Sequence, residues 1–163
     1  MKFWPTPEDP EKMVFEEQYL TKHNIPVAID KCLKFLDTFT LNQKAPLFTN
    51  IEQQHPLVLA NSSKLLADFR ANAWNVHLLP QQHSPQQVCL LLLLYLRSMN
   101  QCIFTETMLK QWMGIAEQLE QQDTGALDKE TLENVKNLLQ TLPHINYATL
   151  RRIIICLAKY GII

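Results

Sequence analysis

The sequence predicts a single all-α domain, and three observations lead to that prediction. The chain has 163 residues, 47% apolar and 19% charged, which is enough to bury a core of ordinary size in one soluble domain. It contains only three glycines, too few for a turn-rich β architecture or for most phosphate-binding loops. Over much of its length, apolar residues recur at the three- and four-residue spacing of an amphipathic helix.

The first expected helix follows Pro26, in the segment VAIDKCLKFLDTF at residues 27–39. Its apolar residues form one stripe, made of Ile29, Cys32, Leu33 and Leu36. Asp30, Lys31 and Lys34 fall outside the stripe, so we expect them on the exposed side of the helix.

The second expected helix begins after Asn61 or Ser62, either of which could cap it. Its apolar face carries Leu65, Leu66 and Phe69. Residues 40–61 show no helical period, and we expect a long loop between the two helices. Residues 1–24 are rich in proline and acidic side chains, so we expect an extended arm that precedes a helical domain of residues 25–163.

The third expected helix contains VCLLLLLYL, residues 88–96, with five consecutive leucines. Ser84 can cap this helix, and Pro85 suits its first turn, where the missing N–H costs nothing. The apolar run is only nine residues long, whereas a transmembrane helix needs roughly 20. A helix that is apolar on every side must be covered on every side, so we expect residues 90–96 at the centre of the bundle.

Three further helices complete the expected bundle. The fourth opens near Thr105, the fifth starts at Asp128 and stops before Pro143, and the sixth has Asn146 as its N-cap. The inward positions expected in these helices are Met108, Trp112, Ile115 and Leu119, then Leu132, Val135, Leu138, Leu139 and Leu142, and finally Leu150, Ile153, Ile154 and Leu157.

Composition also weighs against several kinds of site. The four cysteines form no CxxC pair and fall mostly at apolar helical positions, so we expect reduced, buried thiols in a cytoplasmic protein rather than disulfides. A net charge of −1 gives no broad nucleic-acid or acidic-membrane footprint. His77 and His83 lack a third ligand nearby, and Cys89 and Cys102 lack a polarising partner. We therefore expect no metal, no cofactor and no nucleophilic cysteine.

Two segments resemble motifs of the Rho GTPase-activating (RhoGAP) domain family. The stretch LLLLYLRSMNQCIF is similar to the family's helix LLKxYLRELPEPL, with Tyr95, Leu96 and Arg97 in matching places. Further along, LPHINYATLRRIIICLAKY is similar to LPxxNxxTLxxLxxHL; its matching residues are Leu142, Pro143, Asn146, Thr149 and Leu150. The earlier IPVAIDKCLKFLD resembles the family's opening helix. The resemblance covers about residues 25–160 and implies one RhoGAP-like helical bundle.

The same resemblance implies that catalytic side chains are missing. The family's finger loop, G-[IL]-[FY]-R, has its nearest counterpart in residues 46–49, so Thr49 stands at the arginine position. A threonine hydroxyl is neutral and short and cannot cancel phosphate charge, whereas an arginine finger contributes roughly 10³–10⁵ in rate. The family's lysine aligns with Leu93, and its later NLAxVFGP segment has no counterpart before Ile163, so the C-terminal part of the family domain is absent from this sequence.

Three functions stay open at this point. The first is a catalytically impaired RhoGAP-like domain that acts as an adaptor for a Rho-family GTPase or another signalling protein. On the resemblance, its binding candidates are Thr49, Arg97, Asn146 and Arg151. The second is an active GTPase activator with a relocated arginine, for which Arg70 is the candidate. The third is a helical interaction module unrelated to GTPases. Of these three, we expect a function without strong catalysis.

Each binding candidate that carries a strong polar group also has a plain structural interpretation. Arg97 can act as a cation beside the C-terminal carbonyls of its helix. Asn146 can act as a helix cap. Arg151 and Arg152 lie early in the last helix, where solvated side chains are the ordinary expectation.

Overall fold

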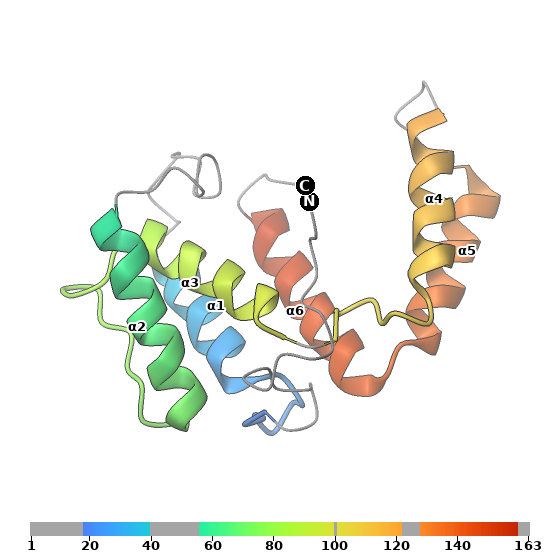
Figure 1. Cartoon of the computed structure of the whole chain (residues 1–163). Helices are drawn as coiled ribbons and strands as arrows, with labels where there is room; N and C mark the ends of the chain where they lie inside the picture. Colours follow the sequence, from blue (N-terminus) through green and yellow to red (C-terminus); the bar gives the residue numbers. More distant parts are fainter. Residues whose placement is uncertain (1–17, 40–55, 100, 122–127, 160–163) are drawn as a thin grey trace.

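The structure, a computed structural model, describes residues 18–39, 56–99, 101–121 and 128–159. All the regular elements in these residues are α-helices (Figure 1). They are α1 (Val27–Phe39), α2 (Pro56–Asn72), α3 (Pro85–Arg97), α4 (Leu109–Gln121), α5 (Lys129–Thr141) and α6 (His144–Lys159). The all-α prediction is confirmed. The expected finger loop, with Thr49, lies outside the described residues.

Helix α3 lies at the centre of the larger group of helices. It contacts both α1 and α2, and α1 also contacts α6 (Figure 1). Buried residues of α1 and α3 join Phe69 of α2 and Ile153 and Cys156 of α6 in one apolar cluster. Residues 90–92 are buried in this cluster, whereas Leu93 is only partly buried against it. The leucine run is therefore core, as expected, but its later turns lie closer to the surface.

Helices α4 and α5 form an antiparallel pair beside the larger group (Figure 1). At the base of the pair, the Thr141 hydroxyl lies 3.8 Å from the Met108 sulfur. Within the described residues, the core cluster takes no side chain from α4 or α5. Leu119 and Leu132, expected to face inward, are exposed, and so is Ile154 of α6. For these three residues the prediction is wrong: α4 and α5 cover only part of each other's apolar stripes, and no described helix covers Leu119, Leu132 or Ile154.

Two of the expected helix starts are confirmed by their caps. The Ser84 hydroxyl accepts a hydrogen bond from the backbone N–H of Gln87 at 3.1 Å, and Pro85 opens α3. At the start of α5, an Asp128 carboxylate oxygen accepts from the backbone N–H of Thr131 at 2.7 Å. Both caps satisfy donors that a helix leaves free in its first turn, and both could be identified from local sequence.

The expected start of α2 is wrong, because the helix begins at Pro56 within the segment predicted to be a loop. Its first turns are mostly exposed, so they show no apolar stripe. Ser62, a predicted cap, is instead buried inside the helix, and its hydroxyl donates to the Gln87 carbonyl at 3.2 Å. Helix α4 also starts later than expected, at Leu109, because Thr105 adopts a left-handed conformation with φ 59°.

Lys31 was expected on an exposed helix face, and that expectation is wrong. Its ammonium donates to the carbonyl oxygens of Ala73, Trp74 and Val76 at 2.8, 2.8 and 2.6 Å. These carbonyls belong to the chain that leaves the C-terminal end of α2, where free carbonyls favour a cation. Lys31 therefore fastens α1 to the end of α2, whereas Lys34 is exposed as expected.

The described end of the N-terminal arm turns back against the core. The Tyr95 hydroxyl of α3 donates to the side-chain carbonyl of Gln18, and both side chains are buried. Leu20 pairs with Pro26 in an isolated antiparallel bridge. Residues 18–26 thus cover one end of α1. Among the six described helices, none has both the length and the apolar character that crossing a membrane requires.

Candidate functional site

The last turn of α3 carries the arginine of the first motif. Arg97 is exposed at the end of this helix. The helix closes at Ser98, whose N–H donates to the carbonyls of Leu94 and Tyr95 at 3.0 and 3.1 Å and whose hydroxyl donates to the Tyr95 carbonyl at 2.7 Å. A cation in this turn stabilises a helix through the negative end of its dipole. Arg97 can therefore stabilise the end of α3 while its side chain stays exposed to a partner.

One turn earlier, the surface of α3 is apolar. Leu93 is partly buried and packs against the core cluster. Leu92, its neighbour, is buried and only 2% exposed. The four residues from Leu93 to Arg97 correspond to about one helical turn, so the two side chains lie on the same side of α3. This side of α3 therefore carries the Arg97 guanidinium and the aliphatic side chain of Leu93.

Asn146 forms a buried hydrogen bond to a distant segment that could not be predicted from the sequence. Its side-chain N–H donates to the Ile103 carbonyl at 2.9 Å, and the residue is only 4% exposed. The predicted N-cap role is wrong, because α6 already begins at His144. The buried amide ties α6 to the segment that follows α3. A side chain held in this way is not presented on the surface.

Arg151 is exposed on α6, five residues beyond Asn146. Five residues turn a helix by about 140° past a full turn, so these two candidates do not share a face. Arg152, expected to be solvated, instead forms an ion pair with Asp37 of α1 at 2.7 Å, and Lys159 lies 3.4 Å from the same carboxylate. This cluster joins α6 to α1, which leaves Arg151 as the solvated member of the arginine pair.

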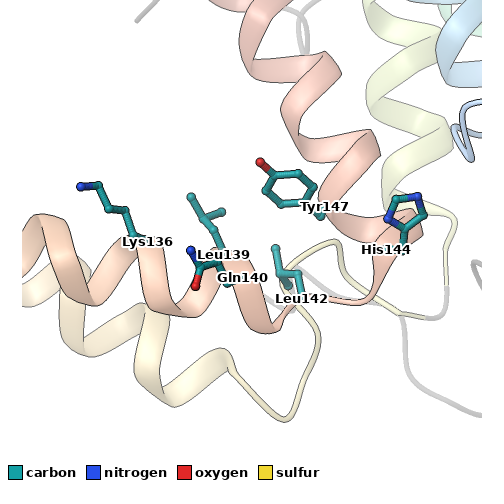
Figure 2. Close-up of a pocket in the computed structure, with 6 residues that line it drawn as sticks. All are labelled: Lys136, Leu139, Gln140, Leu142, His144 and Tyr147. Carbon is teal, nitrogen blue, oxygen red and sulfur yellow. The ribbon is translucent and has the colours of Figure 1, made fainter.

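A shallow pocket of about 390 Å³ lies where α5 meets α6 (Figure 2). Leu139 and Leu142 supply apolar surface from the α5 side, and the Tyr147 ring faces them from α6. Lys136 and His144 add polar edges. Sequence reasoning missed this pocket, since Tyr147 and His144 occupy variable positions of the second motif and the leucines were assigned to a closed core.

The cysteines offer no nucleophile. Cys32, Cys89, Cys102 and Cys156 are all free and buried, as expected. Burial, with a smaller contribution from Cys156, raises the pKa of the Cys89 thiol to about 12. Burial likewise raises the pKa of Cys102. Because only the thiolate reacts readily, these thiols are unreactive at neutral pH. Within the described ranges, no cluster of three His, Cys, Asp or Glu residues could hold a metal ion.

Comparison with known proteins identifies the family of this chain. The RhoGAP domain family matches residues 26–160. The chain belongs to the RhoGAP domain family. A mouse protein, Arf-GAP with Rho-GAP domain, ANK repeat and PH domain-containing protein 3, is 27% identical over 139 residues, which are 85% of this chain and 8% of that protein. The human Arf-GAP with Rho-GAP domain, ANK repeat and PH domain-containing protein 2 is 26% identical over 139 residues, 85% of this chain and 7% of that protein.

This RhoGAP domain spans less than a tenth of the length of these curated relatives. Membership of the family places it in small-GTPase signalling, and the family predicted from the two sequence motifs is confirmed. The motifs lie on elements that the structure brings together: the first at the end of α3 and the second at the junction of α5 and α6, joined by the bond from Asn146 to Ile103.

Proposed function

We propose that this RhoGAP domain binds a Rho-family small GTPase as an adaptor and does not strongly accelerate GTP hydrolysis. The observation that carries the proposal is the pairing of an exposed Arg97 with an apolar, partly buried Leu93 one turn before it. Acceleration requires a cationic donor aimed at the transferring phosphoryl group. At the family's lysine position this domain has an aliphatic side chain, and at the finger position it has Thr49.

A relocated arginine finger is the competing possibility, and the position of Arg70 counts against it. Arg70 lies in the last turn of α2 and is partly buried. Burial raises the pKa of Tyr95 on α3, and the nearby Arg70 partly offsets that rise. Arg70 therefore lies beside the α2–α3 interface on a packed helix. An arginine that must reach a partner's phosphate needs a freer position than this.

Hydrolysis can be tested directly in a single-turnover assay with Rho-, Rac- and Cdc42-type GTPases at micromolar concentrations of the domain. We expect less than about hundredfold acceleration, against roughly 10³–10⁵ for an arginine finger. Leu93→Lys should not restore activity, because it supplies the supporting lysine without the finger. Acceleration above about hundredfold would overturn the proposal, and its loss in Arg70→Ala would then assign the finger to α2.

Binding is tested separately, with GTPases loaded with GDP and aluminium fluoride, with a GTP analogue or with GDP alone. We expect binding of the GTP-analogue form that Arg97→Ala weakens about tenfold, or by about 1.4 kcal/mol. Arg151→Ala tests the other exposed arginine among the binding candidates, and we expect it to weaken binding less. If no form binds at all, the domain is a helical interaction module without a GTPase partner. The four buried, free thiols support a reducing, cytoplasmic compartment for this activity.

A further inference from the structure

A groove of about 340 Å³ runs between α4 and α5, away from the RhoGAP motifs. Among the residues that the structure describes, four carboxamide side chains line it, two from each helix: Gln111 and Gln118 from α4, and Asn134 and Asn137 from α5. Ile115 and Leu138 supply its apolar surface. The groove thus combines uncharged hydrogen-bonding groups with an apolar floor, and neither feature is explained by the packing of the core.

Gly114 also lines this groove, in the interior of α4. Glycine is among the least favourable residues in a helix interior, and only proline is worse. A Cβ added at position 114 would meet no atom within 4 Å, so the fold has no steric need for glycine here. Because Gly114 has no side chain, the groove stays open down to the backbone of α4. The glycine at position 114 is a second observation, independent of the carboxamides, and it also indicates that a ligand occupies the groove.

The spacing of the carboxamides suits an extended polypeptide. Each carboxamide carries both a donor and an acceptor, the same pair of groups that a peptide unit presents. Gln111 and Gln118 are seven residues apart, which is about 10 Å along a helix. That distance corresponds to about three residues of extended chain. An extended segment leaves its backbone N–H and C=O groups unpaired, and the two helices can satisfy them from both walls of the groove.

The groove continues toward the tip of the hairpin into a second hollow of about 250 Å³, because Gln118 and Asn134 line both. Asp128 and Glu130 lie in this continuation. The Asp128 carboxylate is held by the N–H and hydroxyl of Thr131 at 2.7 and 2.8 Å, so it stays fixed in place. Among the described residues that line the two hollows, no lysine or arginine occurs. One end of the groove is therefore acidic and the rest is neutral.

We propose that the α4–α5 groove binds an extended polypeptide segment, with its backbone on the four carboxamides, a peptide unit close to Gly114 and a basic side chain at the Asp128 and Glu130 end. The acidic end and the lack of lining cations disfavour an anionic lipid or a nucleic acid. The site lies on α4 and α5 and uses neither Arg97 nor Leu93, so it does not depend on the proposed GTPase binding.

A library of random dodecapeptides displayed on phage provides the probe, selected against the full chain. We expect recovered peptides to share one lysine or arginine at a fixed place and to bind Gly114→Ala about tenfold more weakly, while Gly114→Ala itself melts at a higher temperature than the parent. Asn134→Leu should weaken the same peptides, and Ala116→Ser, exposed on the opposite side of α4, should not. Side-chain amide signals of Asn134 and Asn137 should shift when the peptide is added.

Three results would overturn the proposal. One is that no peptide is recovered. Another is that recovered peptides bind Gly114→Ala and Asn134→Leu as tightly as the parent. The last is a self-association of the chain, measured by sedimentation, that disappears in Gly114→Ala; the groove would then hold a second copy. Because Gly114→Ala should stabilise the fold, a loss of binding in that variant cannot be attributed to unfolding.

Discussion

Four of the six helices have the same length, and they divide into two kinds. Helices α1, α3, α4 and α5 each have 13 residues. Seven residues are buried in α1 and six in α3, against one each in α4 and α5. The first pair is held by apolar packing on several sides, and the second pair mainly by each other. Stability is therefore concentrated in α1, α2, α3 and α6, and the α4–α5 hairpin is a less protected unit of the same domain.

The strongest test of this difference compares a core leucine with an apolar residue of the hairpin. Leu91 of α3 is 0% exposed, whereas Met113 of α4 is 54% exposed. Leu91→Ala should lower the free energy of unfolding by about 3 kcal/mol, through lost transfer energy and the cavity left behind. Met113→Ala should change it by no more than about 0.5 kcal/mol. Urea unfolding measures both, and equal losses would abolish the distinction between the two regions.

A smaller effect is expected from the contact that fastens α1 to α2. Lys31→Met removes an ammonium that donates to three carbonyls while keeping most of the aliphatic stem. Bonds of this kind to a charged group contribute about 2 kcal/mol net, so a loss of that order is expected. Lys34→Met is the matched control, because the Lys34 side chain is 70% exposed and its ion-pair partner is the Asp30 carboxylate, which is 13% exposed. If both variants unfold at the parent's urea midpoint, the Lys31 contact contributes nothing.

The third test uses pH, since three of the four buried thiols, those of Cys32, Cys89 and Cys156, lie in the core helices. Burial raises the pKa of Cys89 from an ordinary 9.0 to about 12, so the folded state keeps a proton that the unfolded chain releases. The stabilisation from this group is complete below pH 9 and is lost as the pH rises toward 12, at about 1.4 kcal/mol per pH unit. Urea midpoints should fall across this window, and Cys89→Ala should show a shallower decline. If the urea midpoint of Cys89→Ala falls with pH as steeply as that of the parent, Cys89 does not cause the decline.

Features set by neighbouring residues could be predicted from the sequence. Ser84 and Asp128 each cap the helix that begins at the next residue by accepting from an N–H three residues along, so their geometry is local. The start of α2 could not be predicted in the same way, because its first turns are exposed and carry no apolar period. Leu119 and Leu132 show the limit of periodicity. A stripe indicates that a helix has an apolar side, but it does not indicate what covers that side.

The site was predictable to a similar extent. The motifs placed Arg97 at the end of a helix, and the structure agrees. The partner of Asn146 is the Ile103 carbonyl, and the partners of Lys31 begin at Ala73. Such contacts depend on how distant segments pack, so neither could be obtained from spacing along the chain.

The ion pair between Asp37 and Arg152 joins residues 115 positions apart and closes a loop that contains α2 to α5. For a flexible loop, doubling the length adds only about 0.6 kcal/mol to the entropic cost of closure. The hairpin lies within that loop and contributes nothing to the core cluster among the described residues. Lengthening or shortening it should therefore leave the rest of the domain folded. Among the described helices, α4 and α5 are therefore where we expect insertions to be tolerated best, because changes there leave the core cluster intact.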